Sequence, residues 1–175
     1  METVKGPCRS PEEEITRLVE EHQLALLRLC FAYLHDRALA EDAVQETFLK
    51  AYRKLDQFRG NAGMKTWLSA IAINCCRDMR RGGWFRHMDR SVSVDTLPER
   101  AAEAYTPEDE VSVAVMKLPV RLRETVLLYY FEDMNTHEIA ETLRISQQAV
   151  SGRLRRAREK LRKALVSAER RERNG

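Results

Sequence analysis

Amide, hydroxyl and guanidinium side chains between residues 147 and 158 form the part of this sequence best suited to binding another molecule. In a helix they share one face, opposite an apolar stripe of Val150, Leu154, Ala157 and Leu161. Gln can pair with adenine in the major groove of DNA, and Arg can bind guanine or phosphate. The residues of this candidate DNA-reading face are Gln147, Gln148, Ser151, Gly152, Arg155, Arg156 and Arg158.

The residues before this face predict the element that presents it. Asn135 followed by Glu138 is typical of a helix start, and Ser146 can cap a second helix after a break at Arg144 and Ile145. This order predicts a helix-turn-helix whose second helix enters the major groove. A solvated basic helix within a bundle is the alternative, since charge runs are often no more than that.

Charge is distributed unevenly along the chain, although its formal net charge is only +3. Residues 51–90 carry nine Lys and Arg against three acids, whereas residues 91–115 carry one against six. The last sixty residues are basic again, with 14 against eight. Two basic blocks separated by an acidic piece suggest two contacts with a polyanion.

The first basic block places a loop at residues 56–63 beside a predicted helix at 64–81. Cations next to an aromatic and an amide side chain are suited to a single nucleic-acid strand, because they can bind phosphates and an unstacked base. The alternative is a core Phe beside solvated arginines. The candidates are Phe58 and Asn61 in the loop, with Lys65, Asn74, Arg77, Asp78, Arg80 and Arg81 on the helix.

A predicted helix over residues 39–55 has an outer face of acids, an amide and an apolar side chain. Asp42 and Glu46 lie one turn apart, but no third ligand is in register with them, so we expect no metal site. A protein-docking face is the favoured interpretation, and a solvated surface is the alternative. The side chains of this face are Glu41, Asp42, Gln45, Glu46, Leu49 and Lys50.

The remaining sequence predicts an all-α protein of two small helical domains joined by a flexible linker, because no segment alternates with period two. A helix is expected to start at Ser10 and end near His35, and others to end near Lys117 and to cover 121–132. Tyr52 and Tyr130 are expected to point inward. The predicted parts are a loose terminus at 1–9, a domain at 10–83, an acidic linker at 84–106 and a domain at 107–175.

Composition excludes several classes of protein. No apolar run is long enough to cross a bilayer and the acidic start is unlike a signal peptide, so we expect a cytoplasmic protein. Four cysteines without a CxxC pair predict reduced thiols, with Cys30 and Cys75 buried. We expect no cofactor, small-molecule substrate or catalytic site, since no phosphate loop or nucleophile–base pair is present.

Taken in order, four stretches resemble the extracytoplasmic-function (group IV) sigma factors of bacterial RNA polymerase. They are AEDAVQETFLKAY, FRGNAGMKTWLSAIAINCCRDMRR, LPVRLRETVLLYYFED and THEIAETLRISQQAVSGRLRRAREKL, at 40–52, 58–81, 118–133 and 136–161. The resemblance implies a non-catalytic subunit that directs core polymerase to promoters. It also implies control by an anti-sigma factor, often one bound to the membrane.

The resemblance assigns a role to each candidate face. The family's core-polymerase motif falls on Asp42, Gln45, Glu46 and Phe48, next to Leu49, and implies docking on the clamp helices of the largest subunit. The loop and the following helix would separate the two strands of the −10 element and hold a flipped base. The resemblance adds Arg59 and Trp67 to the residues named above for this face. The helix from Gln147 onward would read the −35 element as duplex.

The chain departs from the family pattern at a few positions. Ser151 and Gly152 replace a basic residue and a Ser, so a contact there would be missing or would come from Arg153, Arg155 or Arg156. Ala70 stands where Arg is common, and Gly63-Met64 replaces a small-residue and aromatic pair. The rival interpretation is a dimeric helix-turn-helix regulator with an all-α sensing domain, which would match two half-sites.

Overall fold

The computed structural model describes residues 10–60, 63–81 and 110–173, and every regular element in these ranges is helical. The all-α prediction is therefore confirmed for this part of the chain. The expected loose terminus at 1–9 and the whole of the acidic linker at 84–106 lie outside the described residues. None of the described helices combines the length and the apolar character that crossing a bilayer requires.

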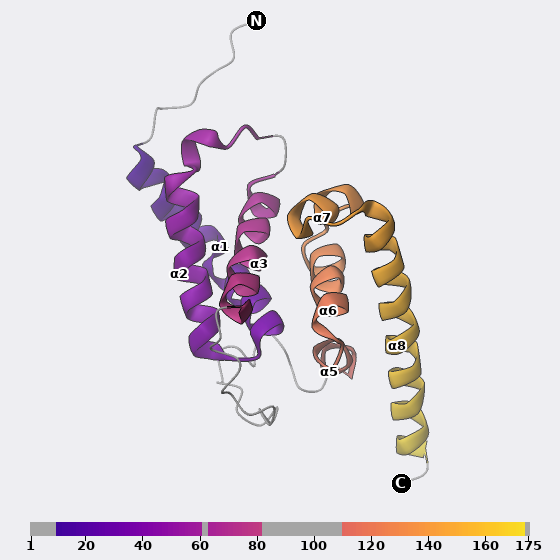
Figure 1. Cartoon of the computed structure of the whole chain (residues 1–175). Helices are drawn as coiled ribbons and strands as arrows, with labels where there is room; N and C mark the ends of the chain where they lie inside the picture. The colour runs from indigo at the N-terminus through magenta and orange to yellow at the C-terminus, as the bar shows by residue number, and fades with distance from the viewer. Residues whose placement is uncertain (1–9, 61–62, 82–109, 174–175) are drawn as a thin grey trace, which may run out of the picture.

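Two groups of helices lie side by side (Figure 1). The first group contains α1 (Pro11–Leu34), α2 (Arg37–Arg53), the short turn η1 (Leu55–Gln57) and α3 (Met64–Arg81). The second contains α5 (Glu110–Met116), α6 (Val120–Val126) with its π-helical continuation η4 (Leu127–Phe131), α7 (Thr136–Leu143) and α8 (Gln147–Arg173). In the first group α1, α2 and α3 pack on one another, and in the second α8 packs on α5, α6 and α7.

Side-chain caps fix where the principal helices begin. The Ser10 hydroxyl accepts from the Glu13 amide at 3.2 Å, and the Glu13 carboxylate accepts from the Ser10 amide at 3.0 Å. Asn135 and Glu138 form the same reciprocal pair at the start of α7, and Ser146 caps α8. Each cap satisfies a backbone N–H that would otherwise lack an intrahelical partner. The three predicted helix starts are confirmed.

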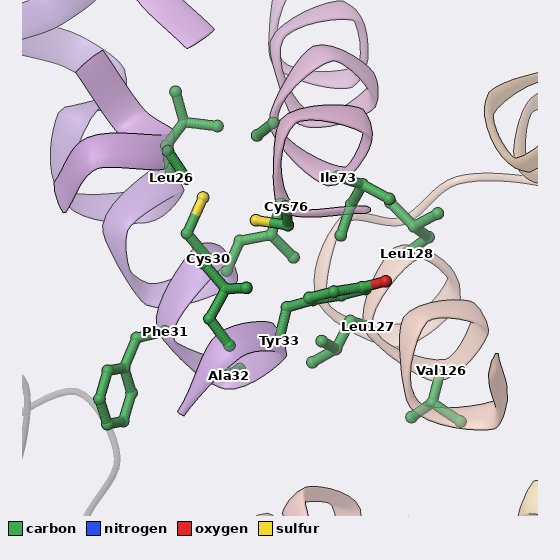
Figure 2. Close-up of a cluster of buried hydrophobic side chains, with 14 of the residues drawn as sticks. Leu26, Cys30, Phe31, Ala32, Tyr33, Ile73, Cys76, Val126, Leu127 and Leu128 are labelled. Atoms are coloured by element: carbon green, nitrogen blue, oxygen red, sulfur yellow. The ribbon is translucent and has the colours of Figure 1, made fainter. Parts of the chain in front are cut away.

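Apolar side chains of α1, α2 and α3 form the core of the first group. Leu18, Leu68 and Ile73 are fully buried. The burial predicted for Cys30 and Cys75 is confirmed, and Cys76 is buried as well. Contact with the Cys30 thiol, followed by burial, raises the pKa of Cys76, and both thiols lie within the cluster drawn in Figure 2.

Two aromatic side chains do not point inward as predicted. Tyr52 is 42% exposed because it lies in the last turn of α2, and its hydroxyl donates to Glu12 at 2.9 Å. Tyr130 is 49% exposed. The helical turn is π-helical from Leu127 to Phe131, and its wider winding moves side chains away from the positions that a period of 3.6 assigns.

The hydrophobic core continues from one helical group into the other. Figure 2 shows the Tyr33 ring reaching from α1 toward Leu127 and Leu128, with Ile73 of α3 alongside. Tyr33 is 3% exposed and the other three are fully buried. Burial at this contact removes apolar surface from water and holds the two groups together in this structure.

Candidate functional site

The predicted DNA-reading face lies on the outer side of α8. The apolar stripe of Val150, Leu154 and Ala157 is buried against the rest of the second group, which turns the polar face to solvent. A helix with one buried stripe and one free polar face has the form of a recognition helix. The exposed side chains of this face are Gln147, Gln148, Ser151, Arg155, Arg156 and Arg158.

Arg153 is placed apart from the other arginines of α8. Its Nη1 lies 2.8 Å from a carboxylate oxygen of Glu124, which is itself only 2% exposed. The same nitrogen donates to the carbonyl of Arg121 at 3.3 Å. Arg153 thus neutralises a buried carboxylate inside the second group and does not point to the outer face.

Arg158 and Gly152 each shape part of the reading face. The Arg158 guanidinium lies 5.9 Å from the ring centres of Tyr129 and Tyr130, and its Nε donates to the Tyr130 hydroxyl at 2.8 Å. The space in front of Gly152 is open, since a Cβ there would meet nothing nearer than the Arg156 guanidinium at 3.8 Å. A backbone or a base can therefore approach α8 closely at this turn.

The predicted strand-binding residues near the loop form an aromatic pair beside cations. The rings of Phe58 and Trp67 lie 5.0 Å apart and are tilted by 43°, and both are half-buried. Arg59 is exposed, while Asn61 lies outside the described residues. The alternative of a fully buried core Phe does not describe Phe58, which keeps one part in solvent.

Further along α3 the predicted residues differ in what they contact. The Asn74 amide donates to the Ala70 carbonyl at 2.9 Å, so this group is used within its own helix. Asp78 lies 3.8 Å from Lys50. Arg80 lies 6.0 Å from the ring centre of Tyr33. Arg81 is exposed at the end of the helix.

Two cations of α3, Lys65 and Arg77, face the second helical group. Lys65 Nζ lies 3.7 Å from the Glu132 carboxylate, and Arg77 Nε lies 3.7 Å from the Glu124 carboxylate. Arg77 Nη1 also donates to the Leu143 carbonyl at 3.0 Å. Sequence reasoning did not find these partners, because they lie far along the chain and no local pattern signals the pairing.

Titratable groups at this contact have shifted pKa values. Burial, and then the nearby Arg123 guanidinium, lowers the pKa of His35 to about 4. Burial raises the pKa of Glu132, although the Ser69 hydroxyl and Lys65 oppose that shift. Burial and Glu124 raise the pKa of Tyr33, whose hydroxyl donates to Glu124 at 3.1 Å.

The predicted docking face lies on α2 beside a groove. Asp42, Gln45 and Leu49 are exposed, with Leu49 at 52%. Glu46 is half-buried and lies 3.6 Å from Lys50, while Phe48 is 8% exposed and lines the groove floor. The outer surface of α2 therefore combines a carboxylate, an amide and apolar groups, as a docking face requires.

The groove itself runs between α1 and α2 and has a volume of about 1110 Å³. Sequence reasoning found its α2 side and missed its α1 side, where Leu24 is 54% exposed. An apolar side chain outside the buried stripe of α1 was the signal available. The α1 residues that line the groove are Glu12, Ile15, Val19, Gln23, Leu24, Leu27, Arg28 and Phe31.

Comparison with known proteins assigns both helical groups to described families. The Sigma-70 region 2 family model matches residues 18–86, and the Sigma-70, region 4 model matches residues 108–161. The chain is 32% identical over 171 residues to the RNA polymerase sigma-H factor of Pseudomonas aeruginosa, covering 90% of this chain and 89% of the relative. It is 30% identical over 175 residues to the ECF RNA polymerase sigma factor SigL of Mycobacterium tuberculosis, covering 94% and 96%.

Solved structures share the arrangement of helices. CnrH in complex with the cytosolic domain of CnrY aligns with a TM-score of 0.63 and 29% identity, over 90% of each chain. The sigma factor RpoE in complex with the anti-sigma factor NepR, from Bartonella quintana, aligns with a TM-score of 0.68 over 87% of this chain and 97% of that one. At 22% identity this second likeness concerns the fold alone.

Proposed function

Because the chain belongs to the extracytoplasmic-function (ECF) family of RNA polymerase sigma factors, we propose which of its surfaces carry that function. α2 docks on core polymerase, α3 with its preceding loop holds the parted −10 element, and α8 reads the −35 element as duplex. The observation that carries this assignment is the simultaneous exposure of two faces. The acid, amide and apolar face of α2 and the polar, basic face of α8 are both open to solvent.

Docking uses Asp42, Gln45 and Leu49 on α2, supported by Glu46 and Phe48. The groove beside them supplies apolar area, which gives affinity, while the amide and the carboxylate give orientation. The clamp helices of the largest polymerase subunit are the partner that we assign to this surface. The subunit has no catalytic chemistry of its own and would act in the cytoplasm, where polymerase works.

Promoter binding divides between the two cationic faces. Gln147 and Gln148 lie at the start of α8, where side chains of a recognition helix reach base edges. Arg155 and Arg156, about two turns further along α8, are placed to bind phosphates, and this binding weakens as salt rises. On the other group, Phe58 and Trp67 offer aromatic surface for an unstacked base next to Arg59, and Arg81 lies at the far end of α3, where it can bind a phosphate further along the strand. Arg153 is left out of the DNA contacts because it is ion-paired inside the second group.

An anti-sigma factor is the partner that we expect to hold the chain inactive. CnrH, 29% identical to this chain, was solved with the cytosolic domain of CnrY. The groove between α1 and α2 offers an apolar surface that such a protein can cover, and coverage there excludes polymerase.

The test is transcription in vitro from purified core polymerase and a library of genomic promoters. Addition of the chain should start transcripts at a small set of promoters that core polymerase alone does not use. A chain that forms dimers and binds duplex DNA, but does not bind core polymerase, would support the repressor-type regulator instead.

A further inference from the structure

Two carboxylates of the second helical group lie against the face of α3 to which we assign the parted strand. Glu124 and Glu132 are 2% and 7% exposed, and each lies 3.7 Å from a cation of that face. Glu124 faces Arg77, and Glu132 faces Lys65. Carboxylate oxygens bind Lys and Arg as phosphate oxygens do, through charge-assisted contacts.

Hydrogen bonds accompany each of these ion pairs across the contact. The Ser69 hydroxyl donates to Glu132 at 2.6 Å, and the Tyr33 hydroxyl donates to Glu124 at 3.1 Å. From the other direction, Arg123 Nη2 donates to the Tyr33 carbonyl at 3.0 Å. Its Nη1 lies 2.9 Å from Nε2 of His35, which accepts when the ring is neutral. Both buried carboxylates have hydrogen-bond partners across the contact, which distinguishes it from a chance meeting of charged surfaces.

The contact covers part of one DNA-binding face, where the side chains of Arg77 and Lys65 are 20% and 46% exposed, and leaves the other face open. A strand bound along α3 would need Lys65 and Arg77, and it would need the space that η4 and α7 occupy. The face of α8 from Gln147 to Arg156 stays exposed, as do Asp42 and Gln45 on the docking surface. Polymerase and duplex DNA can therefore reach the closed chain, whereas a parted strand would have to displace the two carboxylates that already pair with Lys65 and Arg77.

We propose that this chain inhibits itself by closure, with Glu124 and Glu132 standing in for strand phosphates on Arg77 and Lys65. The inference rests on the proposed role of α3 in holding the parted strand. Opening separates the two helical groups, exposes the cations and exchanges two intramolecular ion pairs for contacts with the nucleic acid. Docking on polymerase then comes first, and strand capture follows the separation of the groups.

The experiment compares two charge reversals in the full chain, Glu132→Lys and Glu141→Lys. The first places a second cation against Lys65 and removes the acceptor for Ser69. The second adds the same charge on α7, where the Glu141 side chain is 70% exposed and lies beside His137. Since both variants gain equal charge, a difference between them reports closure and not general attraction to DNA.

Two quantities are measured without polymerase: the radius of gyration by small-angle X-ray scattering, and binding of a labelled single-stranded oligonucleotide by fluorescence anisotropy. Glu132→Lys should be more extended than Glu141→Lys and should bind the strand about tenfold more tightly, because the competent fraction rises. Tyr33→Phe keeps the ring and the charge but removes a hydrogen bond to Glu124. Tyr33→Phe should raise the radius of gyration and the affinity for the strand as well, but by less than Glu132→Lys does. If Glu132→Lys loses its helical circular dichroism, Tyr33→Phe is used for the test instead.

Each outcome decides a separate point. A Glu132→Lys chain as compact as Glu141→Lys overturns closure by these carboxylates. Expansion without a gain in strand binding overturns the masking of α3. Transcription by wild-type chain with core polymerase tests the proposed function by itself. If the wild-type chain transcribes while neither variant changes in compactness, the function stands and the self-inhibition fails.

Discussion

Arg77 of α3 donates from Nη1 to the backbone carbonyl of Leu143 at 3.0 Å. Leu143 is the last residue of α7, and its carbonyl is one of those that a helix leaves without an intrahelical partner. A cation at this end also interacts favourably with the helix dipole. The turn of the helix-turn-helix is thus held against the first helical group by a residue that we assign to the parted strand.

Arg153→Ala should destabilise the fold. Glu124 would lose the guanidinium 2.8 Å away and keep the longer contact with Arg77 and the hydrogen bond from Tyr33. Loss of one charge-assisted hydrogen bond to a buried carboxylate costs about 1–3 kcal/mol. Arg155→Ala is the matched control, since Arg155 is exposed and surface changes stay within about 0.5 kcal/mol. Urea unfolding measures both free energies, and equal values would contradict the assignment of Arg153 to the interior.

Acidification should weaken the folded chain through His35. Its pKa is lowered from 6.5 to about 4, so its stabilising contribution is complete above pH 6.5 and is lost as the pH falls toward 4. The raised pKa of Glu132 acts oppositely, because a carboxyl that protonates more easily when folded favours the folded state at low pH.

His35→Asn removes this titration and keeps a side chain suited to the backbone, which has φ 58° at this position. Between pH 7 and 4.5 the wild-type chain should lose about 1–2 kcal/mol more unfolding free energy than the variant, after discounting for partial exposure. Urea titrations at a series of pH values measure this difference. Parallel curves for the two proteins would refute the role of His35.

Leu49→Glu should weaken binding to core polymerase by about tenfold or more, because it places a charge in the apolar part of the docking face. Folding should be unchanged, since Leu49 is 52% exposed. Val166→Glu is the matched control, as Val166 is 42% exposed on α8, away from the groove. Fluorescence titration of labelled chain with core polymerase compares the two, and similar losses would argue against α2 as the docking helix.

Substitutions on α8 should separate sequence preference from general affinity. Gln147→Ala should cost about 1–3 kcal/mol on the preferred duplex and little on unrelated duplexes. Arg155→Ala should weaken binding to all duplexes alike and reduce the salt slope by about one. Anisotropy titrations over a range of salt distinguish the two patterns. If both variants lose affinity equally on every duplex, the amide does not read bases.

Local signals were enough to predict the helices and the faces they expose. Ser10, Asn135 and Ser146 cap their helices by accepting hydrogen bonds from backbone amides three residues further on. Such caps depend on local sequence alone, so the sequence predicts them. Tyr130 was misplaced because the π-helical turn from Leu127 to Phe131 depends on packing that no short window contains. Tyr52 was misplaced because the periodic pattern does not show that α2 ends at Arg53, which leaves Tyr52 in the last turn and partly exposed.

The contact between the helical groups could not be predicted from the sequence. Tyr33 and Glu124 lie 91 positions apart in the chain, and neither stands in a motif that requires the other. Arg153 resembles its neighbours in sequence, and only its distance to Glu124 places it in the interior. Pairings of this kind follow from the tertiary arrangement and not from propensity.

The uncovered groove between α1 and α2 has a consequence for the solubility of the isolated chain. Leu24, Leu49 and Tyr52 expose apolar surface to water along this groove. Such exposed patches favour aggregation as the protein concentration rises. If a cell synthesises this chain faster than polymerase or an inhibitor binds it, the unbound chain would be lost to aggregation or proteolysis. The exposed apolar surface of the groove thereby limits the concentration that unbound sigma factor can reach.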